Sequence, residues 1–151
     1  PTLLSARFTC KELFTTGGLI VDDATSESGK VIKVTSAQTN EVAWFGPYIC
    51  LEPGNYTVKF KLKTNVVGGY EKIIKLDVYS NSMQKELASV DIYSVNITKA
   101  LTWHTFTLQL NLPVRVADAE FRGLVLVNDV TVFIDYVEVT PLNIFTNSNN
   151  K

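Results

Sequence analysis

The sequence contains few of the residues that catalytic and metal-binding sites most often use. Its 151 residues include one histidine, His104, and two cysteines, Cys10 and Cys50. No GxSxG, HExxH or phosphate-binding glycine loop is present. His104 lies between Trp103 and Thr105 near the start of an expected strand, and we interpret it as a half-buried structural residue. These absences predict that the protein is not an enzyme.

Charge and hydropathy argue against two classes of partner. The 14 basic residues are balanced by 15 acidic ones, whereas a general phosphate-binding surface needs a basic excess. No apolar run approaches the roughly 18 residues that a membrane-spanning helix requires. We therefore expect neither nucleic acid nor a membrane as a partner. No secretory signal sequence is visible at Pro1, so we expect a mature chain, a cytosolic one, or a piece of a longer protein.

The cysteines are too few for a disulfide-rich scaffold, and they do not form a CxxC metal motif. Cys10 lies in an expected first strand within residues 3–14, and Cys50 follows strand-like residues. The two either form one bridge across the fold or are small buried hydrophobic residues.

Helical periodicity is also absent, since no segment of about ten residues keeps a 3.6-residue apolar repeat. Alternation with a period of two is common instead, and it is clearest after the turn at Pro53-Gly54. Such alternation is typical of strands that have one buried and one solvent-exposed face. We expect the core to include Tyr56, Val58, Phe60, Leu62, Phe106, Leu108 and Leu110.

Short strands separated by polar turns continue along the chain, and about eight to ten are expected. Uneven strand and loop lengths favour an all-β, antiparallel jelly-roll β-sandwich over a closed up-and-down barrel. We predict a single domain over residues 1–142 and a flexible polar tail over residues 143–151. Further strands are predicted at 30–35, 74–79, 88–93, 105–111, 119–127 and 131–139.

Three segments of the chain resemble one known family. They are residues 51–58 (LEPGNYTV), 102–106 (TWHTF) and 133–139 (FIDYVEV), and their order and spacing match over nearly the whole chain. They are similar to carbohydrate-binding modules of families 6 and 35, which are galactose-binding-like jelly rolls. The resemblance implies a module of a larger extracellular protein, a structural calcium ion, and a sugar site at the loop end or on a sheet face. Phe133 and Ala100 stand where it implies an asparagine and a tryptophan at the loop-end site.

A sugar site needs a flat aromatic face for the apolar side of the ring and planar polar groups for the hydroxyls. Trp44 at a loop–strand junction, Tyr70 after two glycines and Tyr79 on the solvent side of its strand are candidate platforms. The alternatives are core positions for the tryptophans, surface tyrosines without function, and a plain hairpin turn at residues 128–129. The predicted ligand-binding residues are Trp44, Tyr70, Tyr79, Trp103, Asn128 and Asp129.

Acidic residues in two places suggest a calcium site, because calcium takes about six to eight oxygen ligands in proteins. Asp22, Asp23 and Glu27 share one polar loop. Asp135 interrupts an apolar strand, where a partly buried carboxylate needs a cation or hydrogen-bond donors. We predict a structural calcium ion bound by these residues. Solvated loop acids are the alternative for the first three.

The leading hypothesis is a non-catalytic carbohydrate-binding module that targets a larger multidomain protein, extracellular or at the cell surface, to a polysaccharide or glycan. The alternative is a structural or protein-interaction β-sandwich of a surface or viral particle protein, and a third possibility is a small β-sandwich hydrolase. Exposed tryptophan and tyrosine clustered on one surface favour the first. A contiguous aliphatic patch or an open edge strand favours the second.

Overall fold

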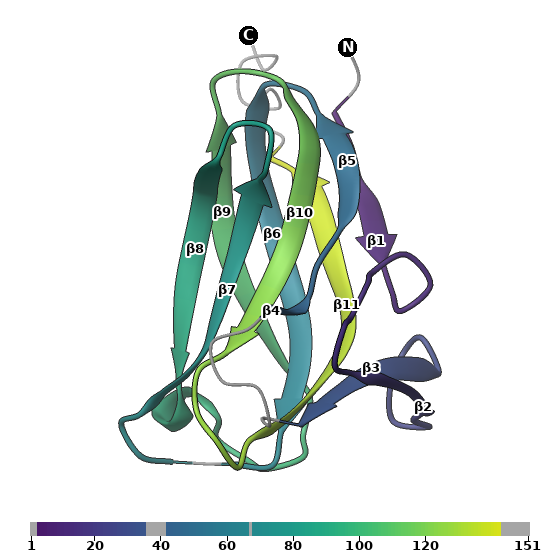
Figure 1. Ribbon diagram of the computed structural model, residues 1–151, viewed down its shortest axis with the longest axis vertical. Coiled ribbons are helices and arrows are strands. Elements are labelled where there is room, and N and C mark those ends of the chain that lie inside the picture. Colours follow the sequence, from purple (N-terminus) through teal and green to yellow (C-terminus); the bar gives the residue numbers. More distant parts are fainter. Residues whose placement is uncertain (1–2, 36–41, 67, 143–151) are drawn as a thin grey trace, which may run out of the picture.

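The computed structural model describes residues 3–35, 42–66 and 68–142. In these ranges a six-stranded and a five-stranded antiparallel sheet form a sandwich (Figure 1). One short 3-10 helix, η1 (Ser94–Asn96), is present, and the described part of the chain has no α-helix. No helix there is long and apolar enough to cross a membrane. The predicted all-β jelly-roll sandwich is confirmed, while the predicted tail at 143–151 lies outside the described residues.

The six-stranded sheet is built around two long strands that pair along most of their length. Its order is β2 (Leu19–Asp22), β3 (Lys30–Thr35), β11 (Thr131–Pro141), β6 (Gly54–Thr64) and β9 (His104–Leu112), and β1 (Ala6–Phe8) also pairs with β11. The β11–β6 register shifts between Ile134 and Tyr136. This shift falls at Asp135 and breaks the alternation of the strand there.

The five-stranded sheet lies opposite. Its order is β4 (Val42–Trp44), β10 (Val116–Val125), β7 (Lys72–Ser80) and β8 (Lys85–Tyr93), and β5 (Pro47–Leu51) also pairs with β10. β4 and β5 are separate strands, and Gly46 between them adopts a φ of +84°, a left-handed conformation that glycine accepts without steric cost.

The core fills the space between the two sheets, as the alternating pattern predicts. Phe106 is half-buried and packs against the edge of this core. The other predicted core residues are at most 5% exposed; they are Tyr56, Val58, Phe60, Leu62, Leu108 and Leu110.

The N-terminal region differs from the expectation. The first strand is only Ala6–Phe8, and Cys10 follows it in a turn. β2 is a strand that the sequence pattern does not predict, because its Leu19 and Ile20 are 67% and 56% exposed and do not alternate with polar residues. Both cysteines are free thiols, with Cys10 half-buried and Cys50 exposed.

Candidate functional site

A pocket opens at one end of the sandwich, at the lower end of Figure 1, where the β6–β7 loop, η1 and the β10–β11 turn meet. Its volume of about 460 Å³ lies in the usual range of small-molecule sites. We call it the loop-end pocket. Its apolar lining residues are Val66, Ile73 and Val130, and the others are Gly68, Gly69, Tyr70, Glu71, Ser94, Asn128 and Asp129.

One wall of the pocket is the β6–β7 loop, which backbone hydrogen bonds tie to η1. Gly68 N donates to Ser94 O at 3.0 Å, and Ser94 N donates to Glu71 O at 2.8 Å. Gly69 has a φ of +92°, and a Cβ there would lie 3.0 Å from Ser94 Oγ. Glycine at this position therefore serves both the turn and the close approach to the serine.

The opposite wall is the β10–β11 turn, which the Asn65 side chain holds in place. Asn65 Oδ1 accepts a bond from Thr131 N at 2.8 Å, and its Nδ2 donates to Asp129 O at 3.5 Å. Asp129 has a φ of +64°, a left-handed conformation that aspartate and asparagine tolerate better than most residues. The side chains of this turn are consequently presented from a fixed backbone.

The lining combines an apolar base with a polar, partly aromatic rim. Ile73 and Val130 are 1% and 3% exposed and form part of the base. On the rim, the Tyr70 side chain is 91% exposed, so its ring is available for stacking. Ser94 is only 6% exposed, and within the described residues its Oγ has no hydrogen-bond partner. Such an arrangement suits a small ligand that has both hydroxyl groups and an apolar face.

The structure brings Tyr70, Asn128 and Asp129 together in this pocket, although they come from separate loops. Trp44 is not part of it. This side chain is 0% exposed, and a Cβ at Gly123 would lie 2.2 Å from Trp44 Cζ2. The prediction of Trp44 as a stacking platform is wrong, because β4 directs its indole into the space that Gly123 leaves in the core.

Trp103 lies elsewhere, next to the lysines on the outer side of β6. Its Nε1 donates to Thr25 Oγ1 at 3.0 Å, while Lys63 Nζ and Lys61 Nζ lie 4.7 and 5.9 Å from the ring centroid. These cation–π contacts and the hydrogen bond engage the indole within the protein. Trp103 thus packs the loop that contains Thr25 against the sheet, and it does not join the predicted ligand residues of the pocket.

Tyr79 is half-buried on β7, as part of a polar row on the five-stranded sheet. The Arg122 guanidinium lies 4.0 Å from its ring centroid and forms two bonds, of 2.8 and 2.7 Å, to the fully buried Asp77 carboxylate. The Asp77 bonds are the largest cause of the raised pKa of Arg122. Arginine therefore stacks on the ring where a sugar was expected.

The predicted calcium ligands do not fit a calcium ion. Asp135 is 0% exposed, and its carboxylate accepts bonds from Glu27 N at 2.8 Å, from Ser28 N at 3.1 Å and from Ser28 Oγ. Lys61 Nζ lies 3.8 Å from the same carboxylate. Donors and an ammonium group thus surround this carboxylate, whereas a cation would require further oxygen ligands.

The three loop acids are each paired with basic side chains. Glu27 bonds to Lys61 at 2.6 Å and to Arg7 at 3.2 Å, and these bonds lower its pKa to about 2. Burial acts to raise the pKa of Asp23, but bonds from Lys63 and Thr25 outweigh it and lower that pKa. Asp22 pairs with Lys30 at 2.5 Å. No group of three or more metal-ligating side chains occurs in the described residues, and the acids that were expected to bind calcium are ion-paired with lysine and arginine instead.

An exposed aromatic cluster was not predicted from the sequence. Phe14 and Phe45 form an isolated β-bridge, and their ring centroids lie 5.7 Å apart. Tyr48 lies 6.0 Å from Phe14, and the two are 46% and 48% exposed. Glu120 is next to Tyr48, and burial is the largest cause of its raised pKa. The aromatic residues on both sides of Gly46-Pro47 were the available signal.

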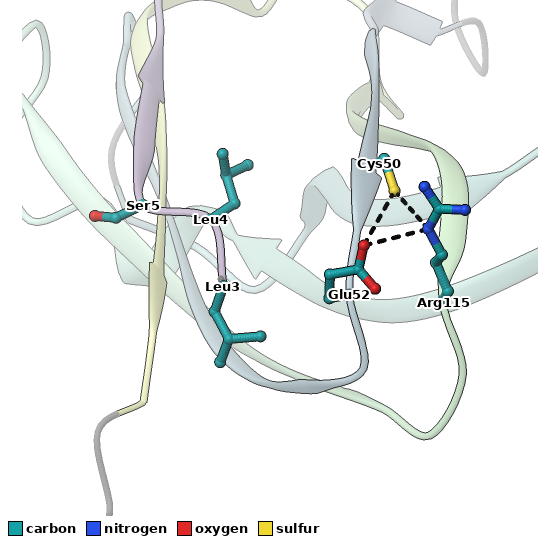
Figure 2. Close-up of a pocket in the computed structure, with 6 residues that line it drawn as sticks. All are labelled: Leu3, Leu4, Ser5, Cys50, Glu52 and Arg115. Atoms are coloured by element: carbon teal, nitrogen blue, oxygen red, sulfur yellow. Dashed lines mark hydrogen bonds and ion pairs between the residues drawn. The ribbon is translucent and has the colours of Figure 1, made fainter. Parts of the chain in front are cut away.

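A second pocket, of about 710 Å³, lies at the opposite end of the sandwich (Figure 2). It is lined by Leu3, Leu4, Ser5, Cys50, Glu52 and Arg115. Arg115 Nε lies 3.1 Å from Cys50 Sγ and 3.3 Å from Glu52 Oε2. The described residues of its lining include no aromatic ring, and its arginine is paired, so this pocket is the weaker candidate for a sugar.

No protein-family model and no curated protein sequence matches the chain. Solved structures do match it. A family 6 carbohydrate-binding module of Cellvibrio mixtus lichenase 5A, solved with cellotriose, has a TM-score of 0.62 at 10% identity and covers 91% of this chain and 98% of that module. A family 35 module from Clostridium thermocellum has a TM-score of 0.59 at 12% identity, and the match covers 92% of this chain and 99% of that module.

A larger protein also contains this fold. Xylanase 10B of Clostridium thermocellum was solved as its CBM22-1 and GH10 modules with xylohexaose. It matches this chain with a TM-score of 0.59 at 13% identity, and the match covers 93% of this chain and 28% of the xylanase chain. At identities this low, the structural match establishes a shared fold but not a shared ligand. This chain has the jelly-roll fold of carbohydrate-binding modules such as those of families 6 and 35.

Proposed function

We propose that this protein is a non-catalytic carbohydrate-binding module whose loop-end pocket binds a polysaccharide or glycan. The observation that carries the proposal is the convergence of an exposed ring, Tyr70, with polar groups of Ser94, Asn128 and Asp129 over an apolar base. Several structural neighbours that share the fold are carbohydrate-binding modules, which supports the same class of ligand.

The pocket matches the two chemically different sides of a pyranose. A ring face stacked on Tyr70 removes apolar area from water, which contributes about 25 cal/mol per Å². Sugar hydroxyls exchange water for protein hydrogen bonds and contribute about 1 kcal/mol net each. Stacking is therefore expected to dominate affinity, while the polar rim determines which sugar is accepted.

A targeting role follows from the same proposal. Modules of this fold occur beside catalytic modules, as in the two-module xylanase structure. We infer that this chain holds a larger extracellular or cell-surface protein on its glycan and that it does not catalyse. His104 supports the second point, since its Nδ1 bonds to Thr102 O at 2.8 Å and its Nε2 accepts a bond from Thr98 N at 3.2 Å. Both ring nitrogens are thus used by the protein.

Affinity electrophoresis against a broad polysaccharide panel tests the proposal. The unmutated protein should be retarded by at least one polymer, and Tyr70→Ala should abolish most of that retardation. Tyr48→Ala is the matched control, because Tyr48 is also an exposed tyrosine but lies in the aromatic cluster. If only Tyr48→Ala weakens binding, the sugar site is the cluster. If the unmutated protein binds nothing in the panel, the proposed function is rejected.

A second candidate function is supported by β2. Its Leu19 and Ile20 are strongly exposed, and in the described residues this strand pairs only with β3. An exposed apolar edge strand is a typical docking element, so this edge favours a structural or protein-interaction module. Sedimentation over a range of concentrations tests self-association. Association that Ile20→Lys removes would support this function, whereas a monomer at every concentration would contradict association with itself.

A further inference from the structure

The charge of the loop-end pocket is one-sided. Glu71 and Asp129 both line it, and among the described residues no lysine or arginine does. Neither carboxylate takes part in an ion pair in the part of the chain that the structure describes. Lys72, the residue after Glu71, is instead paired with Asp91 on β8 at 3.4 Å. The pocket therefore presents two uncompensated negative charges to a ligand.

Ser94 provides an independent sign that a ligand belongs there. Its side chain is more than nine-tenths buried, it lines the pocket, and its hydroxyl has no partner within the described residues. The backbone around it is fixed, because its carbonyl accepts bonds from Gly68 N at 3.0 Å and Ile97 N at 3.1 Å. A hydroxyl that lines a pocket and makes no hydrogen bond within the described residues is available to a ligand, and such a bond makes a modest net contribution to affinity.

We propose that the loop-end pocket is selective for amino sugars, binds neutral sugars less tightly, and rejects uronates. This selectivity rests on the proposed function. A carboxylate accepts hydrogen bonds and donates none, so Glu71 and Asp129 match hydroxyl and ammonium groups. The ammonium group of an amino sugar adds charge-assisted bonds to these carboxylates. The carboxylate of a uronate faces two like charges with no cation in the lining to offset them.

The selectivity is measured by isothermal titration calorimetry at low salt with three matched probes. These are a β-1,4-linked glucose oligomer, the glucosamine oligomer of the same length and the glucuronate oligomer of the same length. Two exposed charges in water change affinity modestly, so we expect the glucosamine oligomer to bind about tenfold more tightly than the glucose oligomer. The glucuronate oligomer should bind at least about tenfold more weakly than the glucose oligomer. Added salt should narrow both differences.

Variants that remove charge but keep shape assign the effect to residues. Glu71→Gln or Asp129→Asn should each reduce the glucosamine-to-glucose ratio by about threefold, and the double variant by about tenfold. Asparagine tolerates the left-handed backbone of position 129, so the turn is kept. Glu52→Gln is the matched control, because it removes one carboxylate at the opposite end of the sandwich. The ratio of glucosamine-oligomer to glucose-oligomer affinity of the Glu52→Gln variant should equal that of the unmutated protein.

The outcomes separate the two proposals. If the glucose oligomer binds but glucuronate binds as tightly, or the pocket variants leave the ratio unchanged, the charge selectivity is wrong while the carbohydrate-binding function stands. If none of the three probes binds and the wider polysaccharide panel is also negative, the proposed function fails, and the selectivity fails with it.

Discussion

Asp135 offers the sharpest test of how the protein's own hydrogen-bond donors hold its polar loop. Its buried carboxylate accepts bonds from Glu27 N, Ser28 N and Ser28 Oγ. In Asp135→Asn, one oxygen acceptor is replaced by an NH₂ donor. Whichever way the amide is oriented, at least one of the loop donors then faces another donor. The variant keeps the volume of the side chain and changes only its hydrogen bonding.

The expected cost follows from the number of groups left without a partner. One orphaned buried donor costs about 1–3 kcal/mol, so we expect Asp135→Asn to lower the free energy of unfolding by that amount. Asp135→Ala removes every acceptor and leaves Lys61 without this partner, which should cost about 3–5 kcal/mol. Asp22→Asn is the control. Its side chain is 83% exposed in a surface pair with Lys30, and such pairs contribute about 0–1 kcal/mol.

Urea unfolding followed by circular dichroism measures these differences, with and without a chelator and with added calcium. Neither treatment should change the stability of the unmutated protein, because the Asp135 carboxylate is already surrounded by N–H, O–H and ammonium groups. A ligand that binds only the folded state must stabilise it. A rise in stability with calcium, or a loss with chelator, would refute this reasoning. So would an Asp135→Asn variant as stable as Asp22→Asn.

Three further perturbations test other parts of the structure. Glu27 has a pKa lowered from 4.5 to about 2, and Asp23 also has a lowered pKa, so their contribution to stability is complete above the unfolded pKa. Thermal melts should show stability falling from about pH 4.5 toward pH 2, and a flat profile there would contradict these pairs. Gly123→Ala places a Cβ against Trp44 and should cost about 1–3 kcal/mol, with a changed tryptophan fluorescence; unchanged stability would mean that the indole has room to move. Phe60→Ala should cost about 3–5 kcal/mol in urea unfolding, because it empties a fully buried core position.

The long central strands could be predicted from the sequence because the polarity of each residue indicates which side of the sheet it faces. Four buried residues repeat with a period of two along β6, and they are Tyr56, Val58, Phe60 and Leu62. β4 is different. With only three residues, it is too short to reveal which parity faces inward, and the burial of Trp44 depends on Gly123 in a strand far away in the sequence. Such a pairing of a large and a small residue cannot be predicted from the sequence of either strand alone.

The site was predictable in its parts but not in its assembly. Gly68-Gly69-Tyr70 and Asn128-Asp129 are turn signals in their own segments, and only the topology shows that the two turns meet in one pocket. The basic side chains of β6 were read as facing water because they alternate with core residues. The loop at 22–29 folds back over them, so two of the acids that were expected to bind calcium form ion pairs with these lysines.

The positions of Leu3 and Leu142 determine which end of the proposed module would face away from its ligand. Leu3 lies against the start of β6, since a Cβ at Gly54 would be 3.2 Å from Leu3 Cδ1, and Leu142 N donates to Asn55 O at 2.8 Å. β6 then runs 11 residues to the loop-end pocket, about 33 Å at the rise of an extended strand. Leu3 and Leu142, the first and last residues that the structure describes on these segments, therefore lie at the end of the sandwich away from the pocket. Protein immobilised through a cysteine introduced in place of Leu142, which is 40% exposed, should therefore bind its ligand as well as protein in solution does.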